Sequence, residues 1–163
     1  MKQLLIIRHA KSSWDFSDLN DFDRTLNDRG YKDAPAMAKR FLNKKIAIDA
    51  FISSTAKRAF TTAIYFAEAF KHKEKSIVAL PELYHAGSSV FYDVINKIDD
   101  TLNTVAIFSH NPGITNFINE LTATKIDDMP TCAVFAVTID CKHWCDFESA
   151  KKDFWFFDYP KSS

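Results

Sequence analysis

The sequence predicts an α/β fold: a three-layer α/β/α sandwich with a mostly parallel central sheet and C-terminal antiparallel strands. Short apolar runs alternate with longer segments of helical periodicity through most of the chain, which is the pattern of parallel strands joined by helices. Two further strand-like runs end the chain. No repeat, low-complexity segment or linker divides the 163 residues, so residues 1–163 are expected to form a single domain.

Three short apolar runs predict buried strands, at residues 4–7, 50–53 and 105–108. Each run is followed by a polar turn and then by a helical pattern, an order that favours parallel strands with helices on both faces of the sheet. The first connection, residues 11–25, is longer and polar. It is expected to be a surface loop.

Four segments carry apolar side chains three and four positions apart, which predicts helices. They are expected at residues 27–43, 55–70, 89–98 and 112–122. Apolar stripes at this spacing are typical of helices that pack against a core. The two runs near the end of the chain, residues 132–139 and 153–159, are expected to add mostly antiparallel strands.

Composition narrows the possible functions. Lys and Arg number 21, as do Asp and Glu, so the net charge is zero. This balance argues against a nucleic-acid-binding protein with a broad basic surface. The apolar run before Arg8 is too short for a signal peptide or a membrane span, and we expect a cytoplasmic protein without a membrane partner.

Three cysteines predict no disulfide framework, which fits a reducing compartment. Cys141, His143 and Cys145 lie close together, but a zinc site would need a second ligand cluster and the sequence shows none. We therefore expect no metal site and no cofactor.

Polar side chains follow the three predicted parallel strands. Arg8 and His9 end the first strand, His110 follows the last, and Arg58 lies in the first turn of the helix after the middle strand. Ligands of open α/β sheets bind beyond the carboxyl ends of the strands. If these strands are parallel neighbours, two arginines and two histidines gather at one edge of the sheet.

Two helix starts are expected at the same edge. Asn111 is the expected N-cap of one helix, with Pro112 at its first position, and Ser54 or Thr55 is expected to cap the other. Helix N-termini favour anions, and arginine matches phosphate oxygens. The sequence therefore predicts a positive pocket for a phosphoryl group.

The two histidines indicate chemistry beyond binding. A neutral imidazole is a competent nucleophile towards phosphorus near neutral pH. A second, protonated imidazole would stabilise the charge on the transferring oxygens. His9 and His110 are expected to fill these two roles.

These residues resemble the motifs of the histidine phosphatase superfamily, which has the phosphoglycerate-mutase-like fold. That family combines Arg-His-Gly, Ser-x-x-x-Arg-Ala-x-x-Thr-Ala and a strand that ends in His; the corresponding segments here are "RHA", "SSTAKRAFTTA" and "FSHNPG". The small size, "DRTLNDRG" and "LPELYHA" look most like the SixA-type phosphohistidine phosphatases. The resemblance covers residues 3 to about 117.

The resemblance implies a role for each matching residue. His9 would be the nucleophile that becomes phosphorylated, and Arg8, Arg58 and His110 would clamp the phosphoryl oxygens. Arg24 lies in the segment where the SixA-type branch has an arginine near the phosphate. The alternative for Arg24 is a loop charge that faces solvent.

The sequence departs from the family at three places. Ala10 stands where the family has Gly, and a positive φ would be disfavoured there. Asp15 stands where larger members often have Asn, and its carboxylate would repel a phosphate. The family's general acid is usually a Glu shortly before a Gly; the candidates here are Glu82, His85 or neither.

The expected function is a metal-independent, two-step phosphatase. His9 attacks phosphorus in line, the cationic groups stabilise the transition state, and water then hydrolyses phospho-His9. A weak or missing acid and a short chain without a lid favour phosphohistidine on a protein as substrate. The alternatives are a phosphatase or mutase for a small phosphorylated metabolite and, in another class, a non-catalytic module that binds phosphate or a phosphoprotein. A monomer is expected.

Overall fold

The computed structural model describes residues 1–14 and 20–161. Within these ranges the strands are β1 (Lys2–Arg8), β2 (Ala50–Ser54), β3 (Val78–Leu80), β4 (Thr104–Ser109), β5 (Val134–Ile139) and β6 (Lys152–Asp158). The α-helices among the described residues are α1 (Asp28–Asn43), α2 (Lys57–Ala69), α3 (Ser88–Asn96) and α4 (Gly113–Ile118). The short 3₁₀ turn η1 (Asp21–Asp23) lies between β1 and α1.

The strands form one mixed sheet in the order β3-β2-β4-β1-β5-β6. β4 lies between β1 and β2 and is parallel to both, whereas β5 and β6 pair antiparallel to their neighbours. Arg8 pairs with Ser109 and Ser53 with Phe108, so the carboxyl ends of the three strands lie level. The predicted fold class and the antiparallel C-terminal strands are confirmed.

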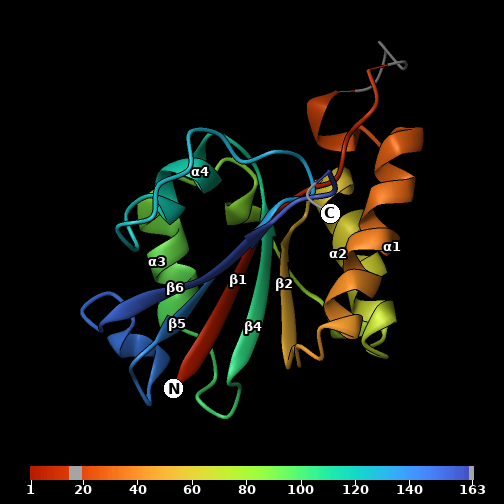
Figure 1. Ribbon diagram of the computed structural model, residues 1–163. Helices are drawn as coiled ribbons and strands as arrows, with labels where there is room; N and C mark the ends of the chain where they lie inside the picture. Colours follow the sequence, from red (N-terminus) through yellow and green to blue (C-terminus); the bar gives the residue numbers. More distant parts are fainter. Residues whose placement is uncertain (15–19, 162–163) are drawn as a thin grey trace.

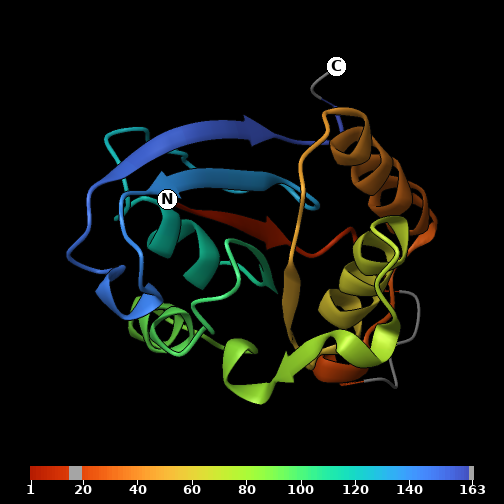
Figure 2. The same ribbon diagram turned by 90° about the horizontal axis from the view of Figure 1, so that it is seen from below.

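Side-chain alternation along β1 explains the three layers. Leu4 and Ile6 belong to the apolar core beneath α3 and α4, and Leu5 and Ile7 to the core beneath α1 and α2. All four side chains are fully buried. A strand covered on both faces needs a continuous apolar run rather than a polar alternation. Figures 1 and 2 show the two helix pairs on opposite sides of the sheet.

The start of α1 is set by a side-chain cap. Oδ1 of Asn27 accepts a hydrogen bond of 2.9 Å from the backbone N–H of Gly30, which satisfies one of the free donors of the first turn. The predicted helix over residues 27–43 therefore begins one residue later and ends where expected. A substitution of Asn27 that removed this cap would shorten the helix from its first turn.

Three expectations need correction. β3 is not among the strands that the sequence predicts, because it has three residues at the sheet's edge and exposed Val78 and Ala79. The predicted helix over residues 112–122 is only the six residues of α4. Residues 11–25 are not simply a surface loop, since Ser12, Ser13 and Arg24 within it are buried.

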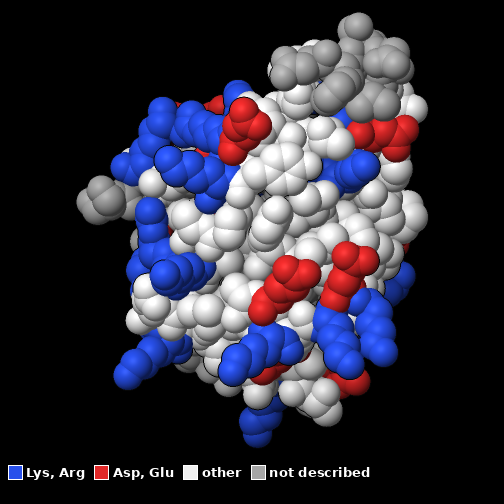
Figure 3. Space-filling view, turned by 90° about the vertical axis from the view of Figure 1, so that its right-hand side faces the viewer, with Lys and Arg blue, Asp and Glu red and all other residues white. Residues whose placement is uncertain are grey.

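Charges of both signs are mixed on the face over α1 and α2 (Figure 3), in keeping with the zero net charge. Within residues 1–14 and 20–161, no helix is long and apolar enough to cross a membrane.

Candidate active site

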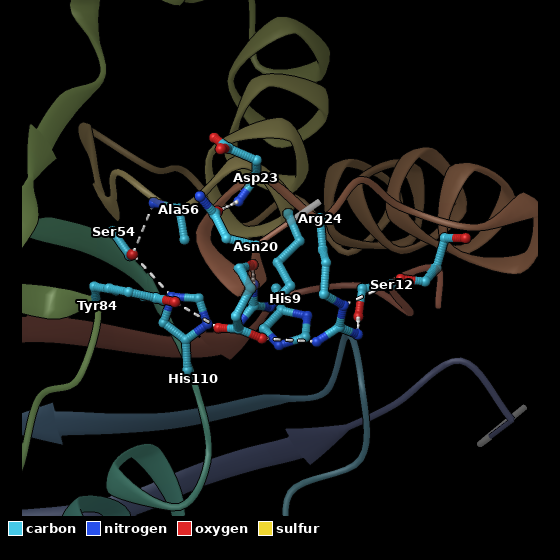
Figure 4. Close-up of polar contacts among 12 residues, drawn as sticks. His9, Ser12, Asn20, Asp23, Arg24, Ser54, Ala56, Tyr84 and His110 are labelled. Carbon is cyan, nitrogen blue, oxygen red and sulfur yellow. Dashed lines mark hydrogen bonds and ion pairs between the residues drawn. The ribbon is translucent and has the colours of Figure 1, made fainter. Parts of the chain in front are cut away.

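All five predicted site residues line one pocket at the carboxyl ends of the parallel strands. The pocket has a volume of about 230 Å³. It brings together Arg8, His9, Arg24, Arg58 and His110. In the close-up of Figure 4, the rings of His9 and His110 lie side by side, with Tyr84 beyond His110 and Arg24 beyond His9. The centroids of the two imidazole rings are 5.2 Å apart.

The tautomer of His9 is fixed by its own backbone. Nδ1 lies 2.7 Å from the carbonyl oxygen of Ala10. A carbonyl only accepts hydrogen bonds, so Nδ1 carries the proton and Nε2 keeps its lone pair in the neutral ring. Burial holds the pKa of His9 well below its usual range, and the nearby positive groups lower it further. His9 is therefore neutral at physiological pH, as nucleophilic attack requires.

His110 is also neutral, which corrects the expectation of a protonated imidazole. Burial and then the charge of Arg58 lower its pKa to about 3. Its Nε2 lies 2.8 Å from Oγ of Ser54, and Ser54 Oγ also accepts a 3.1 Å hydrogen bond from the N–H of Ala56. If the Ser54 hydroxyl donates to Nε2, the proton of the neutral ring lies on Nδ1, which has no partner among the described residues. In this tautomer the buried Nδ1 carries the ring proton.

Arg8 and Arg24 both line the pocket. Arg8 Nη1 donates to the carbonyl of Met129 at 2.7 Å, and its buried Nε has no partner among the described residues. Arg24 is 8% exposed, so it is not a solvent-facing loop charge. Its Nε donates to the Ser13 carbonyl and its Nη2 to Ser12 Oγ.

Asp21 is a site residue that the sequence analysis does not single out. Its carboxylate accepts hydrogen bonds from Arg24 Nη1 and Arg58 Nη2, both at 2.9 Å, and from the Tyr84 hydroxyl at 2.5 Å. Its backbone carbonyl accepts a further 2.6 Å bond from Arg58 Nη1. Asp21 thus holds two of the predicted phosphate-binding arginines in fixed relation. In the sequence, only the preference of arginine for a carboxylate could have indicated a role for Asp21. That preference does not distinguish Asp21 from the other acidic residues between positions 11 and 25.

A second cleft of about 510 Å³ adjoins the pocket and shares Arg58, His110 and Asn111 with it. Tyr84 and His85 line this cleft, but His9 does not. Glu82 lies elsewhere, in an apolar groove between β3 and α3. Of the two predicted acid candidates, His85 is therefore beside the pocket and Glu82 is not.

The replacement of the family's Gly by Ala10 is accommodated. Ala10 is not among the described residues with positive φ, and its side chain is fully buried. Its N–H donates to Thr62 Oγ1 at 3.0 Å, and the Thr62 hydroxyl donates to the carbonyl of Arg58. Thr62 thereby ties the strand end that carries His9 to the helix that carries Arg58. The other departure, Asp15, lies outside the described residues.

The predicted helix caps differ from the structure. Ala56 occupies the N-cap position of α2 and Pro112 that of α4, and neither helix has a side-chain cap. Asn111 does not cap because its amide is engaged elsewhere: it accepts from the Thr115 hydroxyl and donates to Asp128 and the Met129 carbonyl. Arg8, Arg24 and Arg58 line the pocket and give it positive character.

Within the described ranges, no group of three or more His, Cys, Asp or Glu side chains is arranged to hold a metal ion. The arrangement supports phosphoryl chemistry, because it combines a neutral imidazole with three arginines. Arginine guanidinium groups bind the equatorial oxygens of a phosphoryl group and stabilise the charge that develops there.

Comparisons with known proteins agree with this chemistry. A model of the histidine phosphatase superfamily (branch 1) matches residues 4–86. The uncharacterized protein MT1313 of Mycobacterium tuberculosis is 26% identical over 155 residues, which span 87% of this chain and 92% of that protein. A crystal structure of the proposed phosphohistidine phosphatase SixA from Agrobacterium tumefaciens has a TM-score of 0.82 at 24% identity and covers 98% of both chains. The protein histidine phosphatase SixA complexed with tungstate has a TM-score of 0.78 at 24% identity, with 97% of each chain covered. These structural likenesses show the fold.

Proposed function

Because the chain belongs to the histidine phosphatase superfamily, we propose that it is a metal-independent phosphatase that removes phosphate from phosphohistidine on a protein. One observation carries the proposal: His9 is a neutral imidazole, with Nδ1 held by the Ala10 carbonyl, in a pocket that also contains three arginines. A site that only bound phosphate would need the arginines but not an oriented nucleophile.

The reaction proceeds in two steps. The lone pair on His9 Nε2 attacks phosphorus as the bond to the leaving group breaks. Arg8, Arg24 and Arg58 stabilise the charge on the transferring oxygens, and His110 donates to one of them through Nδ1–H. Water then attacks phospho-His9 and releases inorganic phosphate. The Ala10 carbonyl keeps its hydrogen bond to Nδ1–H in both steps.

The phosphohistidine substrate has two sources of support. Of the two candidates for a general acid, Glu82 lies in a different groove from His9 and His85 lines only the adjoining cleft. A phosphoramidate depends less on an acid than an alkyl phosphate does. The second is that the protein histidine phosphatase SixA, whose structure holds tungstate, shares the fold. Another protein of the same fold is a mycobacterial glucosyl-3-phosphoglycerate phosphatase, so a small phosphorylated metabolite is the alternative to be tested.

The proposal is tested by incubating the protein with a phosphohistidine protein and, separately, with an aryl phosphate and a phosphoglycerate, all in EDTA. We expect hydrolysis of the phosphohistidine protein that survives EDTA and is abolished by His9→Ala. His143→Ala, at an exposed histidine outside both pockets, is the matched control. Full activity of His9→Ala would contradict the mechanism, and a preference for the phosphoglycerate would contradict the substrate.

Rapid quenching should trap a phosphoenzyme that is labile in acid and stable in alkali, the signature of phosphohistidine. The scheme uses residues of one chain only, so we propose a monomer, which size-exclusion chromatography with light scattering would check.

A further inference from the structure

Asp21 is the only carboxylate among the described residues that line the phosphate pocket or the adjoining cleft. It lines the cleft, which shares Arg58 and His110 with the pocket that holds His9, and it also contacts Arg24 of that pocket. In-line attack places the leaving group opposite the nucleophile. An in-line attack by His9 would direct the leaving group away from His9, toward the cleft that His9 does not line and Asp21 does.

The carboxyl group of Asp21 stays ionised. Burial alone would raise its pKa, but the hydrogen bonds from Tyr84, Arg58 and Arg24 outweigh burial and hold the pKa well below its usual range. Burial and the contact with Asp21 raise the pKa of Tyr84, so the Tyr84 hydroxyl remains a donor to the carboxylate. Asp21 consequently has no proton to give to a leaving group.

The carboxylate nevertheless has room for another donor. The Asp21 side chain is 46% exposed. Oδ1 accepts from Arg24 alone among the contacts described, whereas Oδ2 accepts from both Arg58 and Tyr84. Two carboxylate oxygens offer about four acceptor sites, so Oδ1 has capacity for one more N–H.

We infer that Asp21 accepts a hydrogen bond from the ring of a substrate phosphohistidine. The donor is the far N–H, that is, the ring nitrogen that does not carry the phosphoryl group. This inference rests on the proposed function and names the group that takes the place of a general acid. A phosphohistidine whose far nitrogen is protonated expels a neutral imidazole, and no proton need be transferred as the bond breaks. An ionised carboxylate at that nitrogen stabilises the protonated form of the ring, which is the better leaving group.

The bonds and charges balance across the step. The lone pair of His9 Nε2 forms the new N–P bond, and the electron pair of the old P–N bond stays on the substrate ring nitrogen. The substrate ring loses its positive charge and becomes neutral imidazole, its far N–H still bonded to Asp21. His9 gains the positive charge, with its own far N–H on the Ala10 carbonyl at 2.7 Å. Each of the two imidazoles thus has an oxygen acceptor at its far nitrogen.

The same carboxylate makes the site selective. An alkyl phosphate presents no ring N–H to Asp21 and leaves as an alkoxide that needs a proton. A metabolite with a second anionic group beside its phosphate would bring like charges together at the cleft. Asp21 therefore favours an imidazole leaving group over an anionic one.

The decisive experiment compares two substrates in Asp21→Asn. The amide has the shape of the carboxylate without its charge. We expect kcat/KM for a phosphohistidine peptide, divided by kcat/KM for 4-nitrophenyl phosphate, to fall at least about tenfold, the effect of losing a hydrogen bond to a charged group. We also expect the alkaline limb of the phosphohistidine profile to move to lower pH. Asp23→Asn is the matched control, because Asp23 lies in the same turn, is exposed and lines neither pocket.

The ratio separates this inference from the alternatives. If Asp21 only positions Arg24 and Arg58, both substrates lose activity together, the ratio stays constant and the inference is overturned. Asp21→Ser gives the same ratio should Asp21→Asn fail to fold. A wild-type protein that hydrolyses 4-nitrophenyl phosphate but not the phosphohistidine peptide would instead overturn the proposed substrate.

Discussion

The hydroxyl oxygen of Ser54 lies 2.8 Å from Nε2 of His110 and accepts the N–H of Ala56 at 3.1 Å. The end of β2 thereby orients a ring carried by the end of β4. Because His110 is neutral, only one of its ring nitrogens carries a proton. The nitrogen with the proton can donate to a phosphoryl oxygen, whereas the lone pair of the other nitrogen would repel that oxygen.

We predict that Ser54→Ala lowers kcat/KM for an aryl phosphate about fivefold, as expected for the loss of one hydrogen bond of about 1 kcal/mol. The ring proton of His110 should then redistribute between Nδ1 and Nε2, which ¹⁵N chemical shifts report directly. Ser53→Ala is the control, since the Ser53 hydroxyl donates to a backbone carbonyl. Identical His110 shifts in the two variants would contradict the assigned role.

The two buried histidines predict that stability falls as the pH drops below about 6.5. Burial lowers the pKa of His110 to about 3 and that of His9 well below its usual range. Below the ordinary histidine pKa, the unfolded chain binds protons that the folded state does not. The free energy of unfolding then falls by up to about 1.4 kcal/mol per pH unit for each ring as the pH decreases.

Urea unfolding at pH 7.5, 6 and 5 measures this loss above the range in which most carboxylates titrate. His110→Asn should remove the contribution of one ring and so flatten the dependence. His143→Ala, at an exposed histidine, should leave the pH dependence of the wild type unchanged. A pH dependence that is the same in His110→Asn and the wild type would show that His110 is not buried as a neutral ring.

We predict that Arg24→Ala weakens inhibition by inorganic phosphate at least about tenfold, because a hydrogen bond to a charged group contributes about 1.5–3 kcal/mol. Arg24 lines the pocket and is buried. Arg29 is the matched control: it forms an exposed pair with Asp33 in α1, and such a pair contributes little. Equal inhibition constants in Arg24→Ala and Arg29→Ala would place Arg24 outside the phosphate site.

Gly113→Ala should destabilise the protein more than Gly87→Ala does. A Cβ at Gly113 would lie 1.8 Å from the carbonyl oxygen of Ala86, whereas one at Gly87 would have no atom within 4 Å. Overpacking of this kind costs about 1–3 kcal/mol, and Gly87→Ala should cost no more than the about 1 kcal/mol of a weakened N-cap. Thermal unfolding of both variants provides the comparison, and equal melting temperatures would contradict it.

The parallel strands and their site residues could be predicted because each is indicated by the residue pattern within a short segment of the sequence. The run of residues 4–7 is apolar since β1 is covered on two faces, and Arg8 and His9 follow where it reaches the edge. Because ligands bind beyond the carboxyl ends of parallel strands, the sequence predicts that His9, Arg58 and His110 lie together, and all three line one pocket.

Other features depend on contacts between distant segments and could not be predicted. Asp21 meets Arg58 and Tyr84 across 37 and 63 positions of sequence, with no periodicity to indicate it. Asn111 has the residue type of an N-cap, but Thr115, Asp128 and Met129 compete for its amide. The neutral state of His110 follows from its burial, which the sequence does not reveal.

Trp14 lies with its ring 3.2 Å from the guanidinium carbon of Arg24 and is 74% exposed. It lines the pocket that holds His9, whereas Trp144 and Trp155 line neither that pocket nor the adjoining cleft. Indole emission responds to nearby charge, so an anion that binds Arg24 will change the fluorescence of one tryptophan and leave two as an internal reference. The fluorescence of Trp14 thus reports whether an anion occupies the pocket, without any added label. A phosphate titration that follows this emission measures binding independently of catalytic turnover.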